Sequence, residues 1–253
     1  MSVLDAHSVV FEGGSGAESS PRVTVVISLY NYAHVVGEAL DTVAAQTLAD
    51  LDLIVVDDCS RDDSGAVVTR WMKTHAGRFN RCTLYRNDRN LGLATTRNIA
   101  LGHVMTEFCF MLDADNCLYP RAIEKLLGAC DASRAEAAYC QLELFGDESE
   151  VGSAAVLSRE RLKRGNYIDA MALLRTATLR DCGGYGLFEI AGWEDYDLWC
   201  TFVDKGLNAA FLPEILCRYR VHGASMLRSE TNKEINSVEL EITARHPWLE
   251  LDR

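Results

Sequence analysis

The chain has 253 residues, of which 48% are hydrophobic and 25% charged, a globular composition that excludes disordered, collagen-like and coiled-coil proteins. Its formal net charge of -12 disfavours a broad phosphate-neutralising surface, so we expect no nucleic acid partner. An acidic protein that binds a phosphorylated ligand needs a metal ion or a local basic group to offset the repulsion.

The sequence has no apolar run of the length that a membrane span requires. Residues 1–10 also lack the basic end and the long apolar stretch of a signal peptide, so we expect a cytoplasmic protein. The nine cysteines are odd in number and form no Cys-x-x-Cys pair, which favours reduced core residues over a disulfide framework or a zinc site. The oligomeric state stays open.

The first half of the chain alternates between strands and helices. Residues 12–20 are rich in glycine and serine, and residues 1–20 show no sustained apolar period, so residues 1–20 are predicted to form a flexible leader. The β-branched run at 22–28 predicts a buried strand, and apolar residues at helical spacing follow between 36 and 46. The same alternation predicts strands at 51–56, 82–85 and 108–112 and helices at 67–72 and 95–103.

The second half is less regular. A helix is predicted from 121 to about 131 and a strand at 137–145, before a polar, irregular segment at 146–164. The tail at 229–253 is charged and is predicted to be helical in part. The remaining predicted elements are strands at 172–176, 209–212 and 216–221 and helices at 178–182 and 194–205.

Strands that alternate with helices predict an α/β fold with a mostly parallel central sheet covered on both faces. Ligands of such sheets bind beyond the carboxyl ends of the strands. Polar groups follow three of the predicted strands, so we expect them to converge on one crevice. They are Tyr30 and Asn31, Asp57 and Asp58, and Asp113 and Asp115.

Asp113 and Asp115 follow a buried strand and lie on the same side of it unless the chain has already turned. Such carboxylates suit Mg²⁺ or Mn²⁺ that carries a substrate diphosphate. A solvated acidic turn is the alternative, because aspartate is common in turns.

Three further residues could recognise a nucleotide. The carboxylate of Asp58 can accept hydrogen bonds from a base or ribose, and the ring of Tyr30 can stack on a base. Arg97 begins a predicted helix and could meet a phosphate or a carboxylate. The alternative for Asp58 and for Tyr30 is a structural role in a turn or at the edge of the core. The alternative for Arg97 is an ordinary surface arginine.

A second acidic site begins the predicted helix at residue 194. The helix dipole alone favours Glu194 and Asp195 there, although a carboxylate in this place can also act as a general base. Trp193 beside them is either a sugar-stacking wall or a core residue. His222 follows the last predicted strand and is either a metal ligand or a surface histidine.

Seven motifs, taken together and in this order, indicate a protein family more specifically than any one of them does. Together they resemble the family 2 glycosyltransferases. The resemblance extends from about residue 21 to 225. It departs from the family at Ser28 and Leu29, where proline is common, and at Cys59, where glycine or asparagine is common. The seven motifs are 25–31, 46–47, 54–60, 90–98, 112–115, 192–199 and 219–222.

The resemblance implies a GT-A-like, Rossmann-type α/β/α sandwich with a single catalytic domain at 21–228. Residues 21–115 would form its nucleotide-binding half and 116–228 its acceptor half. The implied reaction moves a sugar from a nucleotide diphosphate sugar to an acceptor hydroxyl, with inversion and with Mn²⁺ or Mg²⁺ as cofactor. We expect a UDP-sugar first and a TDP-sugar next.

The resemblance leaves the acceptor open among a glycan, a lipid-linked sugar and a small molecule, and it leaves contact with a membrane surface open as well. Asp195 matches the catalytic base, Asp115 matches the metal-binding carboxylate, and His222 matches a histidine that helps to hold the metal or diphosphate. Trp193 and Glu194 match the acceptor side. The donor side comprises Leu29, Tyr30, Asn31, Asp58, Arg97, Asp113 and Ala114.

Other function classes fit less well. A dinucleotide-dependent oxidoreductase is disfavoured because no Gly-x-Gly-x-x-Gly follows the first strand, and a nucleotidyltransferase because residues 29–34 contain no glycine. The remaining alternative is a catalytically silent module that binds a nucleotide sugar or a glycan. The presence of both Asp115 and Asp195 argues against such a module.

Overall fold

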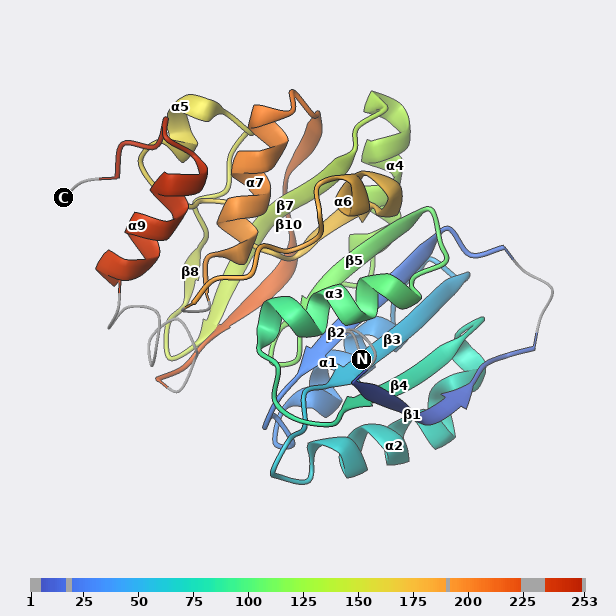
Figure 1. Cartoon of the computed structure of the whole chain (residues 1–253). Coiled ribbons are helices and arrows are strands. Elements are labelled where there is room, and N and C mark those ends of the chain that lie inside the picture. The colour runs from blue at the N-terminus through green and yellow to red at the C-terminus, as the bar shows by residue number, and fades with distance from the viewer. Residues whose placement is uncertain (1–5, 17–19, 190–191, 224–234, 252–253) are drawn as a thin grey trace.

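A computed structural model describes residues 6–16, 20–189, 192–223 and 235–251. Within these residues, ten strands form one sheet in the order β1-β4-β3-β2-β5-β9-β7-β10-β6, with β8 paired to β7 (Figure 1). Helices cover both faces of this sheet. The predicted α/β fold is confirmed.

The centre of the sheet is parallel. Strands β2 (Val23–Leu29), β3 (Leu51–Asp57), β4 (Cys82–Asn87) and β5 (Phe108–Asp113) pair in parallel register. Strands β2, β3 and β5 are mostly apolar because both faces of each are buried. Parallel pairing brings their carboxyl ends to one edge, where the predicted polar groups follow.

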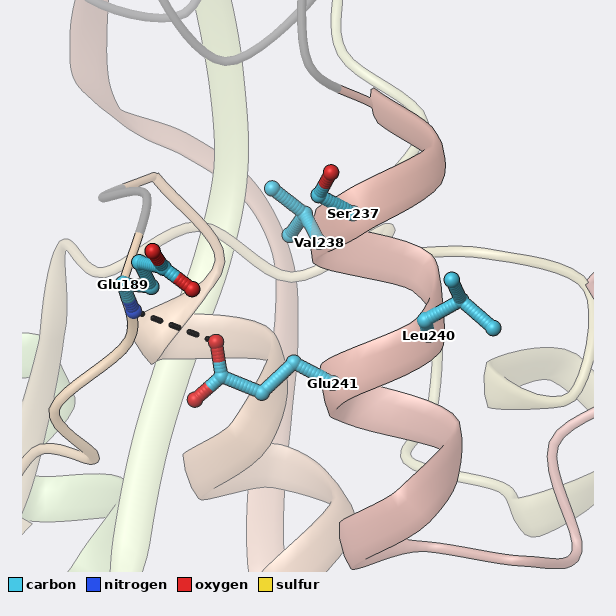
Figure 2. A pocket seen from close by; sticks show the side chains of 5 residues that line it. All are labelled: Glu189, Ser237, Val238, Leu240 and Glu241. Carbon is cyan, nitrogen blue, oxygen red and sulfur yellow. Dashed lines mark hydrogen bonds between the residues drawn. The ribbon is translucent and has the colours of Figure 1, made fainter.

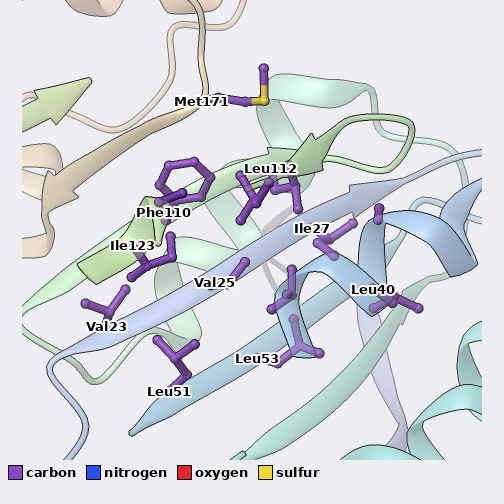
Figure 3. Packing of buried hydrophobic residues seen from close by; sticks show 14 of the residues in the cluster. Val23, Val25, Ile27, Leu40, Leu51, Leu53, Phe110, Leu112, Ile123 and Met171 are labelled. Atoms are coloured by element: carbon purple, nitrogen blue, oxygen red, sulfur yellow. The ribbon is translucent and has the colours of Figure 1, made fainter. Parts of the chain in front are cut away.

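Two layers of helices enclose separate apolar cores. On one face, α1 (Val36–Ala44), α2 (Ser64–His75) and α4 (Ala122–Ser133) pack on the side chains drawn in Figure 3, among them those of β2, β3 and β5. The short 3-10 helix η2 (Ala76–Arg78) follows α2. The other face carries α3 (Leu93–His103), α6 (Thr176–Asp181), α7 (Glu194–Asp204) and α9 (Ile235–Arg245).

The second half of the sheet is mixed. Strand β9 (Ala172–Arg175) runs antiparallel to both β5 and β7 (Ala137–Gly146), and so joins the two halves. Strand β10 (Ala209–Val221) is continuous where the sequence predicts two strands, and its register against β7 shifts near Pro213, a residue without an N–H to donate. The remaining elements are β6 (Cys117–Leu118), β8 (Glu150–Val151) and α5 (Arg159–Leu162).

The amino-terminal segment differs from the predicted flexible leader. Residues His7–Gly13 form the edge strand β1, antiparallel to β4. Most side chains of β1 are exposed, so the strand lacks the apolar pattern by which a buried strand is recognised. Phe11 alone packs against the core from this strand. Residues 1–5 and 17–19 of the predicted leader lie outside the described residues.

The carboxyl-terminal helix α9 packs on the domain rather than extending from it. Val238 and Ile242 are buried, and His246 lies between two carboxylates, 3.0 Å from Asp197 and 2.7 Å from Asp204. Burial alone lowers the pKa of His246, but the two carboxylates raise it overall. The predicted domain boundary at 228 lies outside the described residues.

Among the described residues, no helix has the length and the apolar composition that a membrane span requires.

Ile242→Ala should lower the free energy of unfolding by about 2–5 kcal/mol, because it empties a fully buried position. Leu240→Ala removes a side chain of the same size from the same helix, but Leu240 is 66% exposed, so stability should stay nearly unchanged. Urea titration followed by circular dichroism measures both variants. Equal effects would contradict the docking of α9 on the core.

Candidate functional site

The carboxyl ends of β2, β3 and β5 form the floor of the site. The backbone N–H of Asp58 donates to the carbonyl of Leu29 at 2.8 Å, which holds the ends of β2 and β3 together. The side chain of Leu29 itself is buried in the core. Asn31 has a positive φ of 59° and its Oδ1 accepts from the N–H of Arg61 at 2.7 Å. Asn31 therefore joins the turn after β2 to the turn after β3.

Asp58 organises the loop that leads into α3. Its Oδ1 accepts hydrogen bonds from Asn87 Nδ2 and the N–H of Leu91, both at 2.8 Å, and its Oδ2 accepts from the N–H of Gly92 at 2.9 Å. Gly92 adopts a φ of 84°, a conformation that favours glycine. The predicted nucleotide contact at Asp58 is thus also the residue that fixes the loop beside it.

Asp113 and Asp115 diverge after the end of β5. The side chain of Asp113 is 28% exposed, whereas Asp115 is buried and its Oδ2 lies 2.9 Å from Nε2 of His222. Burial and the neighbouring Asp113 raise the pKa of Asp115, while His222 opposes that rise. Ala114 between them is buried. The structure thus brings both predicted metal ligands together.

The surroundings of Asp115 fit a divalent cation that shares its coordination with a substrate. A carboxylate oxygen and an imidazole nitrogen are ligands that suit Mn²⁺. No group of three or more histidine, cysteine, aspartate or glutamate side chains able to hold a metal occurs among the described residues. Mg²⁺ in proteins usually keeps several waters and is bound by one or two carboxylates together with substrate phosphates.

Tyr32 faces this pair of acids and is not among the residues predicted from the sequence, whereas Tyr30 stays a prediction. The ring of Tyr32 meets that of His222 edge to face at 5.9 Å. Burial, Asp115 and Asp113 together raise the pKa of Tyr32. Tyr30 is partly buried. Nothing in the motif itself distinguishes the two tyrosines, because each follows the end of the strand.

Arg97 connects the two acidic motifs. Its guanidinium is 3% exposed and donates to Asp113 Oδ1 at 2.7 Å and to Glu194 Oε1 at 3.1 Å. It also lies 5.1 Å from the centre of the Tyr185 ring. Burial lowers the pKa of Arg97, but the two carboxylates more than compensate, so the side chain stays charged. A surface arginine, one of the two interpretations above, does not describe this residue.

The beginning of α7 carries the predicted base. Glu194 is buried and accepts from Arg97 and, through Oε2, from the N–H of Gly192 at 2.9 Å. Asp195 is partly exposed, and burial, Glu194 and Asp169 raise its pKa to about 8. Trp193 is partly buried and meets Tyr196 edge to face at 5.5 Å.

Asp169 is a further carboxylate of the site that the sequence analysis did not identify. It precedes β9, and the antiparallel register of β9 with β5 brings this end of β9 to the edge where Asp113 lies. Its Oδ1 accepts from the N–H of Met171 at 2.8 Å, and burial together with Asp113 raises its pKa to about 7. A lone aspartate in an irregular segment offers no signal by which the sequence could reveal it.

The glycine-rich segment before α7 packs closely on α3. Asn98 accepts from the N–H of Tyr185 and donates to its carbonyl, both at 2.8 Å. Gly184 has a φ of 76°, and a Cβ there would lie 2.3 Å from Asn98 Oδ1. At Gly186 a Cβ would lie 2.3 Å from Asp197 Oδ2. A side chain at Gly184 would therefore push this segment away from α3, and one at Gly186 would push it away from α7.

A surface pocket lies between α9 and the segment before α7, apart from these acidic motifs. Figure 2 shows that Glu241 reaches from α9 toward Glu189, whose N–H donates to Glu241 Oε2 at 3.1 Å. No predicted site residue lines this pocket. The lining residues are Glu189, Ser237, Val238, Leu240 and Glu241.

Comparison with known proteins places this site in context. The family model described as Glycosyl transferase family 2 matches residues 24–190. The putative glycosyltransferase EpsE of Bacillus subtilis is 25% identical over 228 residues, which cover 88% of this chain and 81% of EpsE. WfgD of Escherichia coli, a UDP-Glc:alpha-D-GlcNAc-diphosphoundecaprenol beta-1,3-glucosyltransferase, is 24% identical over 208 residues, which cover 81% of this chain and 79% of WfgD.

Solved structures share the fold. S. aureus TarS 1-349 in complex with UDP-GlcNAc superposes with a TM-score of 0.69 at 18% identity, over 82% of this chain and 61% of that one. The mannosyltransferase PcManGT from Pyrobaculum calidifontis, in complex with GDP-Man and Mn²⁺, superposes with a TM-score of 0.67 at 20% identity, over 90% of this chain and 65% of that one. This chain thus spans less than two thirds of either solved chain, and the predicted GT-A fold is confirmed.

Arg97→Met should lower the free energy of unfolding by about 3–5 kcal/mol, because it leaves the Glu194 and Asp113 carboxylates without their buried partner. Adding Glu194→Gln should recover part of this loss. Arg121→Met, at a 62% exposed arginine that pairs with Glu124 on the surface, should change stability little. Denaturant titrations of the wild type, Arg97→Met, Glu194→Gln, the double variant and Arg121→Met form the test, and strictly additive effects of the two changes would rule out the coupling.

Proposed function

The chain belongs to glycosyl transferase family 2, and we propose that it moves a sugar from a nucleotide diphosphate sugar to an acceptor hydroxyl with inversion, by a single displacement. One observation carries the proposal: Arg97 binds Asp113 at 2.7 Å and Glu194 at 3.1 Å. That bridge holds the Asp-x-Asp motif and the residue next to Asp195 in one site, so a donor at the first motif would meet a base at the second.

The donor is a UDP-sugar in the first instance and a TDP-sugar in the second. The name of WfgD includes UDP-Glc, and the TarS complex contains UDP-GlcNAc, which supports the uridine donor. Tyr30, Asn31 and Asp58 would lie on the side of the base and ribose, and Asp113 near the ribose. Leu29 and Ala114 have buried side chains, so their contribution would come from the backbone.

Mn²⁺ or Mg²⁺ would be held by Asp115 and His222, whose ligand atoms already lie 2.9 Å apart. When bound, the cation supplies positive charge where the leaving diphosphate becomes more negative. The Mn²⁺ in the PcManGT complex supports this expectation for the fold. Arg97 adds no free charge of its own, because both ends of its guanidinium are paired within the protein.

Asp195 would take the proton of the acceptor hydroxyl as its oxygen attacks the anomeric carbon. A single displacement needs this base on the face opposite the leaving group. The pKa of Asp195 is raised to about 8, which makes its carboxylate a stronger base than an exposed aspartate. Since only the ionised form accepts the proton, activity would rise with pH as Asp195 loses its proton and would fall below that pH.

Trp193 and Glu194 would border the acceptor in different ways. Trp193 is partly exposed beside Asp195 and could stack on a sugar ring. Glu194 faces Arg97, so it would shape the acceptor side through that contact. The acceptor itself is a glycan, a lipid-linked sugar or a small molecule. The diphosphoundecaprenol acceptor in the name of WfgD favours the lipid-linked sugar, which would bring the protein to a membrane surface.

Asp115→Ala should weaken nucleotide diphosphate binding in the presence of Mn²⁺ at least about tenfold, because it removes the central metal ligand. Calorimetric titration of UDP, TDP, GDP and ADP with Mn²⁺, Mg²⁺ or a chelator measures this. Asp50→Ala, at an exposed aspartate before β3 and away from the site, is the matched control and should bind as the wild type does. Equal wild-type affinity with metal and with chelator would contradict the metal role.

Asp195→Asn should reduce transfer at least about a hundredfold while nucleotide affinity stays the same, because the amide cannot accept the proton. The measurement combines release of the nucleoside diphosphate from its sugar donor with calorimetric affinity. Asp181→Asn makes the same change at an exposed position on α6 and should be as active as the wild type. Undiminished turnover of Asp195→Asn would eliminate Asp195 as the base.

A further inference from the structure

Asn166 lies in the segment between α5 and β9, and its side chain contacts Asp195. Its Nδ2 donates to Asp195 Oδ2 at 3.1 Å, and its Oδ1 accepts from the N–H of Ile168 at 3.2 Å. The bond to Ile168 determines which end of the amide faces Asp195, because only the amide oxygen can accept from an N–H. Asn166 therefore presents a hydrogen-bond donor to the carboxylate.

With this bond, both carboxylate oxygens of Asp195 accept a hydrogen bond. The other oxygen, Oδ1, accepts from the backbone N–H of Tyr196 at 2.7 Å. Two donors on different oxygens fix the plane of a carboxylate, and each oxygen keeps a lone pair for a further donor. An acceptor hydroxyl could therefore approach a carboxylate whose orientation is already set.

The segment that carries Asn166 is itself fastened to the helix of the base. Before it, the carbonyl of Leu162 accepts from the hydroxyl of Tyr196 on α7, and the carbonyl of Lys163 accepts from the N–H of Glu250 at 3.0 Å. After it, Ile168 is buried. Asn166 is exposed, so its side chain can be changed without opening a cavity in the core.

Burial and the neighbouring Glu194 and Asp169 oppose the ionisation of Asp195, whereas Arg97 favours it. A carboxylate among other carboxylates gains protons more readily, whereas a hydrogen bond donated to it favours the ionised form. The Asn166 donor thus acts against the prevailing electrostatics. Six titratable or charged groups interact electrostatically with Asp195. They are Glu194 and Cys200 on α7, Asp169 before β9, Arg97 on α3, Tyr185 before α7, and Tyr219 on β10.

We propose that Asn166 is a positioning residue for the reaction, which orients the Asp195 carboxylate and keeps it ready to accept a proton. The inference rests on the proposed role of Asp195 as the base. It identifies a residue that acts through Asp195 and that needs no contact with either substrate.

The test is a carboxyl ¹³C NMR titration of the full-length, metal-free protein labelled with ¹³C-aspartate. The resonance that disappears in Asp195→Asn identifies the carboxyl of Asp195. Asn166→Ala should raise the titration midpoint of this resonance by about one pH unit, since a hydrogen bond to a charged group is lost. Asn166→Leu also lacks the donor but keeps more of the volume, so its midpoint should move in the same direction.

Asn208→Ala is the matched control. Asn208 is exposed in the loop after α7, at the end of that helix away from Asp195, so the midpoint should stay at its wild-type position. An unchanged midpoint in Asn166→Ala and Asn166→Leu would overturn the proposal, as would opposite shifts in the two. The titration needs no substrate, so it tests the effect of Asn166 on Asp195 separately from the activity. If the midpoint shifts but Asp195→Asn is still active, Asp195 is not the base, and the contact with Asn166 then has no role in catalysis.

Discussion

The buried guanidinium of Arg97 is the interaction on which the geometry of the site depends. Its two partners, Asp113 at the end of β5 and Glu194 at the start of α7, are far apart in the sequence and belong to different halves of the domain. Separating these halves would leave a buried charge without a partner, at a cost of several kcal/mol. The positions of the Asp-x-Asp motif and of Asp195 are therefore not independent, because Arg97 links the two segments directly.

The sequence predicts the parts of the fold that are buried on both sides. Strands β2, β3 and β5 are continuous apolar runs because helices cover both faces, and such runs are recognisable without a structure. Strand β1 and the packing of α9 are not recognisable in this way. The outward side chains of β1 face solvent, and α9 buries only a narrow stripe, so tertiary contacts rather than local pattern decide their places.

The same physical difference separates the site residues that the sequence can predict from those that it cannot. Asp115 and Asp195 could be proposed from sequence because one follows a buried strand and the other begins a helix, and topology predicts where such positions meet. Asp169 and Asn166 could not, because they lie in an irregular segment whose path is set by anchoring at Leu162 and by pairing of β9. A residue type without a periodic context carries no information on what it will contact.

The charge of the site would make the proposed base and the proposed metal ligands depend on each other. Asp113, Asp115, Asp169 and Asp195 share one region, and burial together with the neighbouring carboxylates raises the pKa of Asp169 to about 7 and of Asp195 to about 8. The negative charge of these carboxylates would also oppose the binding of a diphosphate. Neutralising Asp115 with a cation would relieve both effects, since it removes negative charge from the diphosphate side and lowers the pKa of the nearby Asp169. When Asp169 is ionised, its negative charge would again raise the pKa of Asp195. The hydrogen bond from Asn166 favours the ionised form of Asp195, so it would partly offset the rise in pKa that burial and the neighbouring carboxylates cause.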